Sequence, residues 1–296
     1  MTSRPPSHQV RPPVSVWATG QHEGRTQLAQ GPYVAETVRD GARIPPAIAA
    51  HAITAYTRPG HRVLDPVCGA GTVLVEALRA GRDAIGLTGP RWWPIARANV
   101  TAAKRHDAAP DGMVLDTPPG AAVGQLTGYL GHIDLILTTW PRPSPHDAAA
   151  QDRAEARAAT EPLVALLDPY RELLCPGGHV VLVVPRRSRG RLLAPPGDLA
   201  ASGRTVGLVP VERCVALTAE LRGSRLVVRS SPAQRRAAAR YERATRHPVM
   251  LPAHHEVLVF QAPPPTAVAA AVRRPVPGAS LPDHRVRAEL LSGRAA

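Results

Sequence analysis

Two short apolar segments and an amphipathic segment between them dominate the first third of the chain. Residues 62–65 read Arg-Val-Leu-Asp and residues 84–87 read Ala-Ile-Gly-Leu, as expected for buried strands. Between them, residues 73–78 place apolar side chains at helical spacing, and Gly81 marks the end of this helix. Strand, helix and strand in this order predict a βαβ unit.

Further periodic segments extend this unit into an alternating pattern. A helix is expected at 47–56, because Pro45-Pro46 suits a helix start, where missing N–H groups cost nothing. The other expected strands are 113–115, 133–137, 179–184, 209–217 and 255–260, and the other expected helices are 163–174 and 199–206. This succession predicts a single α/β domain with a doubly wound sheet.

Composition separates this domain from two tails. Residues 1–30 are rich in Pro, Gln, Ser and Gly without a hydrophobic period, and are expected to form a disordered arm. Trp17 is the exception within the arm, either docked on the domain or a stray apolar residue. Residues 263–296 are rich in Pro, Ala and Arg and are expected to be disordered. The domain is therefore expected at 31–262.

The turn between the first strand and its helix carries the most specific chemistry. It reads Asp65-Pro66-Val67-Cys68-Gly69-Ala70-Gly71-Thr72. The two glycines permit a sharp turn and the close approach of a ligand, and the following helix directs free N–H groups at the same place. Asp65 can accept hydrogen bonds from a ligand amine or hydroxyl. Position 74 is Leu, where a dinucleotide-binding Gly-x-Gly-x-x-Gly motif has glycine, which argues against NAD.

Three segments resemble the S-adenosylmethionine-dependent methyltransferases that modify exocyclic amino groups of DNA bases: Arg43 to Ala49, Thr57-Arg58-Pro59-Gly60, and Val63 to Thr72. The resemblance extends from about residue 40 to 262. It implies a class I methyltransferase (Rossmann-like) fold with a mostly parallel, seven-stranded sheet, and S-adenosylmethionine as cofactor. The residues that it implies for cofactor binding are Arg43, Pro46, Asp65, Pro66, Cys68, Gly69, Gly71, Thr72, Thr88, Trp92 and Asp116.

One cofactor contact of that family is altered. An acidic residue that binds both ribose hydroxyls usually follows the second strand, and here the chain reads Leu87-Thr88-Gly89-Pro90. Thr88 can offer one neutral hydrogen bond, roughly half as strong as a charge-assisted one, so we expect weaker cofactor binding. Trp92 or Trp93 could cover the adenine or pack the helix on the sheet. Asp116 corresponds to the residue that contacts the adenine amino group, or is a plain turn residue.

The segment after the strand at 133–137 departs further from the family. Amino-methyltransferases carry Asp, Asn or Ser here, then Pro-Pro and an aromatic residue. The side-chain oxygen and a backbone carbonyl accept the hydrogens of the amine, and the aromatic ring stacks on a flipped base. The corresponding candidate catalytic residues are Thr139, Trp140, Pro141 and Arg142. Thr139 replaces the acceptor and Arg142 the aromatic ring, so the motif is repurposed or decayed.

Charge suggests the partner. The chain has 36 Lys and Arg against 23 Asp and Glu, a net charge of +13, which suits a polyanion such as DNA. The alternative is a basic, solvated surface without a specific partner. Two arginine-dense segments, the loop at 186–191 and residues 222–246, are candidates for phosphate contact.

Other site classes find little support. The three cysteines form no Cys-x-x-Cys motif and the histidines lack metal-ligand spacing, so no metal is expected. No apolar segment is as long as a membrane helix and the start lacks a signal-peptide pattern. We therefore expect a cytoplasmic protein without a membrane partner. The sequence leaves the oligomeric state open.

Three functions remain. The first is an active methyltransferase acting on an exocyclic amine of a DNA base. The second is a methyltransferase of RNA or a small molecule, and the third is a catalytically degenerate relative that binds nucleic acid. We rank the first slightly above the third, with the second behind. A cleft beside Gly69 that is open to a nucleoside favours the two enzymes, whereas a cleft filled by Trp92 or Trp140 favours the degenerate protein.

Overall fold

The expected βαβ unit forms the middle of a larger sheet. In the computed structural model, the described residues are 14–264 except 42, 106–109, 118–122, 141–160, 186, 189–190, 193–195, 231 and 249. The chain divides into two compact units, Met1–Pro263 and Pro264–Ala296, and the fold below is that of the first. Its sheet has eight described strands, in the order β1 (Val16–Trp17), β9 (Val209–Leu217), β12 (His254–Gln261), β6 (Leu174–Pro185), β5 (Ile133–Thr139), β2 (Arg62–Asp65), β3 (Asp83–Thr88) and β4 (Gly112–Asp116).

The direction of these strands identifies the fold class. Neighbouring strands are parallel except β12, which is antiparallel to both β6 and β9. The chain winds outward from β2 in both directions, to β3 and β4 on one side and to β5 and β6 on the other. This is the doubly wound class I methyltransferase arrangement, so the expected fold is confirmed.

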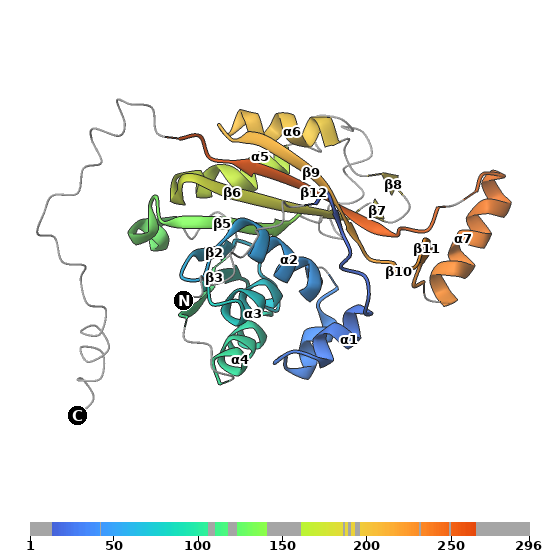
Figure 1. Cartoon of the computed structure of the whole chain (residues 1–296), viewed down its shortest axis with the longest axis horizontal. Helices are drawn as coiled ribbons and strands as arrows, with labels where there is room; N and C mark the ends of the chain where they lie inside the picture. Colours follow the sequence, from blue (N-terminus) through green and yellow to red (C-terminus); the bar gives the residue numbers. More distant parts are fainter. Residues whose placement is uncertain are drawn as a thin grey trace, which may run out of the picture. The chain divides into compact units, whose positions relative to one another are not determined.

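Helices cover both faces of the sheet (Figure 1). One face carries α2 (Pro46–Tyr56), α3 (Thr72–Arg79) and α4 (Trp93–Lys104), and the other carries α5 (Glu161–Leu167), η4 (Asp168–Leu173) and α6 (Pro196–Thr205). Successive residues of a strand point to opposite faces: Val63 lies in the first hydrophobic core and Leu64 in the second. The helix expected at 163–174 is divided into α5 and η4, because Pro169 interrupts the α-helical hydrogen bonds.

The start of the chain corrects one expectation. Residues 14–30 were expected within a disordered arm, but they contain β1 and α1 (Gly24–Ala29). β1 adds an eighth strand by pairing in parallel with β9, where the Val215 N–H donates to the Ser15 carbonyl at 2.8 Å. Trp17 is buried, and its ring centroid lies 4.5 Å from that of His51. β1 thus covers a sheet edge whose backbone groups would otherwise be unpaired.

Short elements complete the described structure. η1 (Ala35–Arg39) and η2 (Val123–Tyr129) are 3-10 helices, and β7 (Arg187–Ser188) pairs with β8 (Arg191–Leu192) in the expected basic loop, whose side chains are not described. Between β9 and β12, the chain forms the hairpin of β10 (Glu220–Arg222) and β11 (Arg225–Val227), then α7 (Pro232–Thr245). Figure 1 shows α7 outside the layers of the sheet and its covering helices.

Candidate functional site

A cavity of about 270 Å³ opens at the carboxyl ends of the central strands. Asp65, Thr88 and Thr139 are the last residues of β2, β3 and β5, and all three line it. β2 lies between β3 and β5, so the cavity is at the position where the winding of the sheet reverses. Doubly wound proteins bind their ligands at this position.

Most of the candidate residues line this cavity. They are Arg43, Asp65, Cys68, Gly69, Thr72, Thr88, Trp92, Thr139 and Trp140. The described candidates outside its lining are Pro46, Pro66, Gly71 and Asp116. Asp116 pairs in register with Thr88 but is exposed at the end of β4. Pro141 and Arg142 lie outside the described residues.

Asp65 is a buried carboxyl group at the centre of the site. Only 3% of Asp65 is exposed, and its Oδ1 accepts the Val67 N–H at 3.0 Å. Burial raises the pKa of Asp65 to about 7, and the nearby Asp40 carboxylate also raises this pKa. A cationic ligand group would favour the ionised carboxylate and offset part of this burial cost.

Asp40 is a site residue that the sequence analysis did not identify. It follows η1, is 3% exposed, and its Oδ2 accepts the Ala70 N–H of the glycine turn at 2.9 Å. The dipeptide Asp40-Gly41 reads as an ordinary turn signal. The contact joins residues 30 positions apart, so no local pattern in the sequence marks it.

The backbone angles and close neighbours of the turn require glycine at both positions, without reference to a ligand. Gly69 has φ +50°, and a Cβ there would lie 2.3 Å from Asp40 Oδ2. Gly71 has φ +83°, and a Cβ there would lie 3.3 Å from Ala96 of α4. The position that a Cβ of residue 69 would take is therefore occupied by the Asp40 carboxyl group, whereas the cavity that Gly69 lines stays open.

The two adjacent tryptophans have different roles in the fold. Trp92 lines the cavity, with the Arg91 guanidinium 5.1 Å from the centroid of its ring. Trp93 instead packs helix on sheet, because its Nε1–H donates to the Val114 carbonyl of β4 at 3.2 Å. Of these two tryptophans, Trp92 is therefore the one whose ring is available to a ligand.

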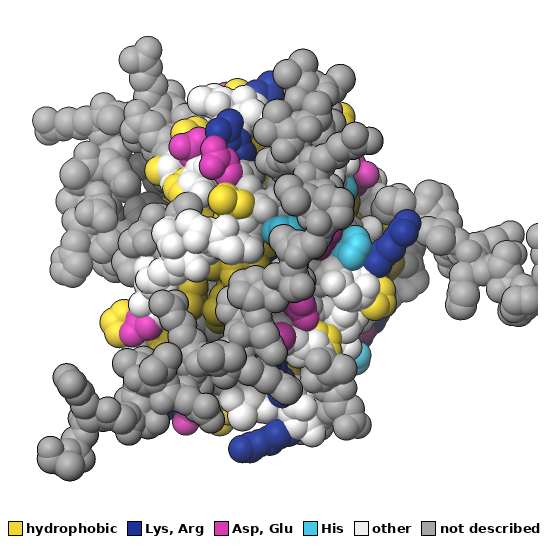
Figure 2. Space-filling view, turned by 90° about the vertical axis from the view of Figure 1, so that its left-hand side faces the viewer, with side chains coloured by type: hydrophobic (Ala, Val, Ile, Leu, Met, Phe, Trp, Pro, Cys, Tyr) yellow, Lys and Arg dark blue, Asp and Glu magenta, His cyan; other side chains and the backbone are white. Residues whose placement is uncertain are grey.

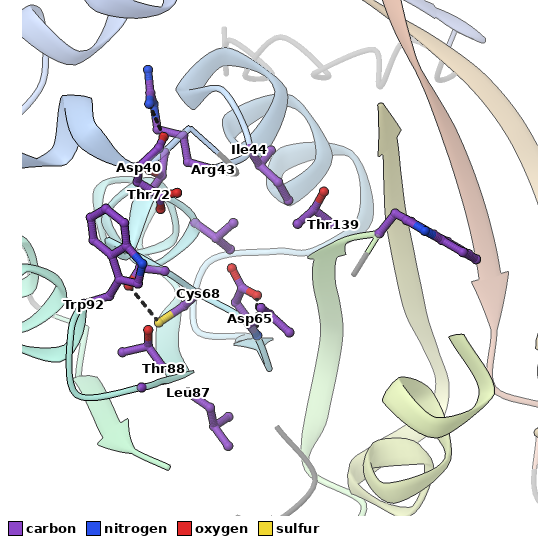
Figure 3. Close-up of a pocket in the computed structure, with 15 residues that line it drawn as sticks. Asp40, Arg43, Ile44, Asp65, Cys68, Thr72, Leu87, Thr88, Trp92 and Thr139 are labelled. Atoms are coloured by element: carbon purple, nitrogen blue, oxygen red, sulfur yellow. Dashed lines mark hydrogen bonds between the residues drawn. The ribbon is translucent and has the colours of Figure 1, made fainter. Parts of the chain in front are cut away.

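The end of β5 presents a hydroxyl with a fixed orientation. Thr139 Oγ1 lies 3.1 Å from the Val183 carbonyl, which can only accept, so the hydroxyl donates there. The Trp140 N–H donates to the same carbonyl at 3.1 Å, and the Trp140 side chain is 6% exposed. The remaining lone pairs of Thr139 can therefore accept a ligand N–H. In Figure 3, Asp65 lies between Trp92 and Thr139.

Arg43 contributes to the site indirectly. Its guanidinium donates to the backbone carbonyl of Asp40 and, at 3.4 Å, to that of Val38. Figure 3 shows the guanidinium directed away from Asp65. Arg43 therefore holds the turn that carries Asp40 rather than presenting its charge to the cavity.

Asn99 of α4 joins three segments of the site. It is fully buried, and its Nδ2 donates to the Ala70 carbonyl at 2.8 Å and to Thr37 Oγ1 at 2.7 Å. Its Oδ1 accepts the Val34 N–H at 2.7 Å. The glycine turn, η1 and α4 thus depend on one amide for their relative position.

We expect Asn99→Ala to lower the free energy of unfolding by about 2 to 3 kcal/mol, because it leaves buried backbone groups unpaired. Urea denaturation measures this loss. Thr101→Ala, which removes an exposed hydroxyl on the same helix, should change stability by less than about 0.5 kcal/mol. Equal losses in the two variants would contradict the assignment of Asn99 as a buried link.

The described residues contain neither a cluster of metal ligands nor a membrane-spanning helix. Among the described residues, no three His, Cys, Asp or Glu side chains group as metal ligands. Within the same part of the chain, no helix has the length and apolar character needed to cross a membrane.

Comparison with known families supports the resemblance. The "DNA methylase" (N6_N4_Mtase) family model matches residues 3–88. This range contains the glycine turn and the preceding segment at 43–49, so the resemblance to DNA amino-methyltransferases is confirmed over this part of the chain. A comparison with curated proteins found no match.

Solved structures resemble the fold. TrmN from Thermus thermophilus is 18% identical over 74% of this chain and 49% of its own, with a TM-score of 0.43. This chain thus spans about half the length of that protein. The 1,6-didemethyltoxoflavin-N1-methyltransferase of Burkholderia thailandensis is 16% identical over 77% of this chain and 81% of its own, with a TM-score of 0.43. Magnesium protoporphyrin IX methyltransferase from Synechocystis PCC 6803 is 12% identical over 73% and 80%, also with a TM-score of 0.43.

Proposed function

We propose that this protein is an S-adenosylmethionine-dependent methyltransferase whose acceptor is an exocyclic amino group of a DNA base. The observation that carries the proposal is the cavity at the reversal point of the sheet, where a buried carboxyl group, an aromatic ring and an oriented hydroxyl come together. The match of residues 3–88 to the DNA methylase family supports the choice of acceptor.

The residues of the cavity fit the cofactor. Asp65 would bind the ammonium of the methionine moiety, because its pKa is raised by burial and by Asp40, and a positive charge would stabilise its ionised form. Trp92 would cover the adenine, and Thr88 would bind one ribose hydroxyl. When bound, S-adenosylmethionine supplies an electrophilic methyl group to an attacking nitrogen.

Thr139 would orient the acceptor amine. Its hydroxyl hydrogen is directed to the Val183 carbonyl, so its oxygen can accept one amine N–H, and the Trp140 carbonyl could accept the other. Holding both hydrogens directs the nitrogen lone pair toward the methyl group. Orientation of this kind can lower the barrier without a strong general base.

A second candidate is a catalytically degenerate protein that binds nucleic acid. Thr88 replaces the ribose acid, and Trp140 is almost completely buried where relatives carry proline. The cavity nevertheless stays open, and Trp92 and Trp140 line it rather than fill it. This openness favours the enzyme.

Titration calorimetry of the full chain with S-adenosylmethionine tests the proposal. Saturable binding, followed by transfer of a labelled methyl group to DNA, would support it. If the label reached only RNA or a small molecule, the enzyme would be a methyltransferase but its acceptor would not be DNA. The absence of binding at millimolar cofactor would exclude both kinds of enzyme and leave the degenerate protein.

We expect Thr139→Val to slow methyl transfer about tenfold, the value of one neutral hydrogen bond, with little change in cofactor affinity. Thr139→Ser, which keeps the hydroxyl, should retain most of the activity. Single-turnover transfer and calorimetry separate the two effects. If Thr139→Val transferred the methyl group as fast as the unaltered chain, the hydroxyl would not be the acceptor.

A further inference from the structure

The segment between β9 and β12 is the most basic part of the described structure. Residues 220–246, here called the basic appendage, comprise β10, β11 and α7 and contain eight arginines and two glutamates. Almost half of the net charge of +13 thus lies in these 27 residues. In contrast, the described Lys and Arg side chains on the face shown in Figure 2 are scattered singly.

α7 has little contact with the rest of the fold. It is the longest described helix, with 14 residues, and none of its described side chains is buried. Tyr241 is 55% exposed. Among its described side chains, only Ala238 and Ala239 are partly covered. A helix with so little buried surface gains little stability from packing, and isolated helices of this length are marginal in water. A binding partner would add packing and electrostatic contacts along this helix.

The arginines of α7 gather on one side of the helix. At 100° per residue, the four arginines 235, 236, 240 and 243 cover roughly 140° of its circumference. Ala239 lies within this arc and Glu242 borders it, whereas Tyr241 and the other alanines of the last three turns lie outside it. Arg246 follows directly after the helix. Guanidinium groups can therefore contact anionic groups over a wide arc around the helix axis.

The part of the basic appendage that precedes α7 is hydrogen-bonded to the N-terminal segment of the domain. The Arg229 guanidinium donates to the Gly20 carbonyl, to the Gln21 carbonyl at 2.7 Å and to Glu220 Oε2 at 2.9 Å. Glu220 also binds Arg222. The chain is therefore held to the domain at Arg229, three residues before α7 begins.

We propose that the basic appendage binds the backbone of duplex DNA, with α7 in the major groove. This inference rests on the proposed function, because it concerns the same substrate. The major groove of B-form DNA, about 12 Å wide, admits an α-helix, whereas the deep and narrow major groove of A-form RNA does not. Arginines spread over 140° can reach the phosphates on both sides of that groove. Because arginine contacts to phosphate carry no sequence information, the binding is independent of sequence.

Fluorescence anisotropy with a labelled 24-base-pair duplex of arbitrary sequence tests this proposal. The variant is the full chain with Arg236→Gln, Arg240→Gln and Arg243→Gln, since glutamine keeps helix propensity. We expect it to bind about 10- to 100-fold more weakly at 100 mM salt, and the slope of log K against log salt to fall by about 3. The control carries Arg58→Gln, Arg105→Gln and Arg204→Gln, exposed arginines outside the appendage, and should bind almost as the unaltered chain does.

Three outcomes would overturn the proposal. Equal weakening in both variants would indicate attraction to the overall charge. Unchanged binding in the appendage variant would place the contact elsewhere. Equally tight, appendage-dependent binding of an RNA duplex would reject the assignment to DNA. Calorimetry with S-adenosylmethionine distinguishes this result from failure of the proposed function, because the appendage variant should bind the cofactor normally.

Discussion

At pH 8, Asp65→Asn is expected to resist urea better than the unaltered chain and to bind S-adenosylmethionine about 30-fold more weakly or worse. Burial raises the pKa of Asp65 to about 7. The folded chain therefore keeps a proton that the unfolded chain releases, and the free energy of unfolding falls as the pH rises from about 4 to about 7. Between pH 5 and pH 8 the free energy of unfolding falls by roughly 3 kcal/mol for this reason. The asparagine side chain that replaces Asp65 does not ionise, so the variant should not show this decrease.

Cofactor binding should show the corresponding pH dependence. A ligand ammonium requires the ionised Asp65 carboxylate, so affinity is expected to rise about tenfold per pH unit below about 7 and then to level off. Binding below this pH releases a proton, which calorimetry in two buffers of different ionisation enthalpy measures. Asp65→Asn should remove both the slope and the proton release.

Asp116→Asn is the matched control for these measurements. Asp116 lies at the end of a neighbouring strand but is exposed and outside the cavity lining. We expect little change in stability or affinity. If Asp116→Asn weakened binding as strongly as Asp65→Asn, the adenine contact implied by the family resemblance would hold in the bound state. If Asp65→Asn left the affinity unchanged, Asp65 would not be a cofactor-binding residue.

Gly69→Ala is expected to destabilise the fold by about 2 to 6 kcal/mol. The left-handed backbone at φ +50° costs a residue with a Cβ about 1 to 3 kcal/mol. The new Cβ would lie 2.3 Å from Asp40 Oδ2, and relieving such overpacking typically costs another 1 to 3 kcal/mol. Chemical denaturation measures the total.

Two further variants separate these causes. Gly124→Ala has open space and no positive φ, so it should change stability by less than about 0.5 kcal/mol. Combining Gly69→Ala with Asp40→Ala removes the overlap, and the double variant should lose less stability than the sum of the single losses. Strict additivity would show that Asp40 and Gly69 do not share the space.

The location of the site could be predicted from sequence because it depends on local patterns. Asp65, Thr88 and Thr139 each end an apolar segment, and the carboxyl ends of parallel strands meet at one edge of a sheet. The glycine turn is equally local. These features and the resemblance were enough to indicate the fold and the strand ends that line the cavity.

What the sequence did not reveal depends on contacts between distant residues. Asp40 belongs to the site only because the chain before α2 folds back over the glycine turn. β1 is ordered by the edge of β9, some 200 residues away in the chain, although the composition around it is typical of a disordered arm. Trp92 and Trp93 are adjacent, and only the position of β4 decides which one packs and which one lines the cavity.

The segment from β1 to α2 also has a thermodynamic consequence. Its Gly20 carbonyl is bound by Arg229 of the basic appendage, and its Asp40 side chain holds the glycine turn of the cavity. A single stretch of about 20 residues thus connects both places. If DNA binds the basic appendage as proposed, any coupling free energy that it transmits through this stretch to the cofactor must act with equal size in the reverse direction, as the effect of cofactor on DNA affinity.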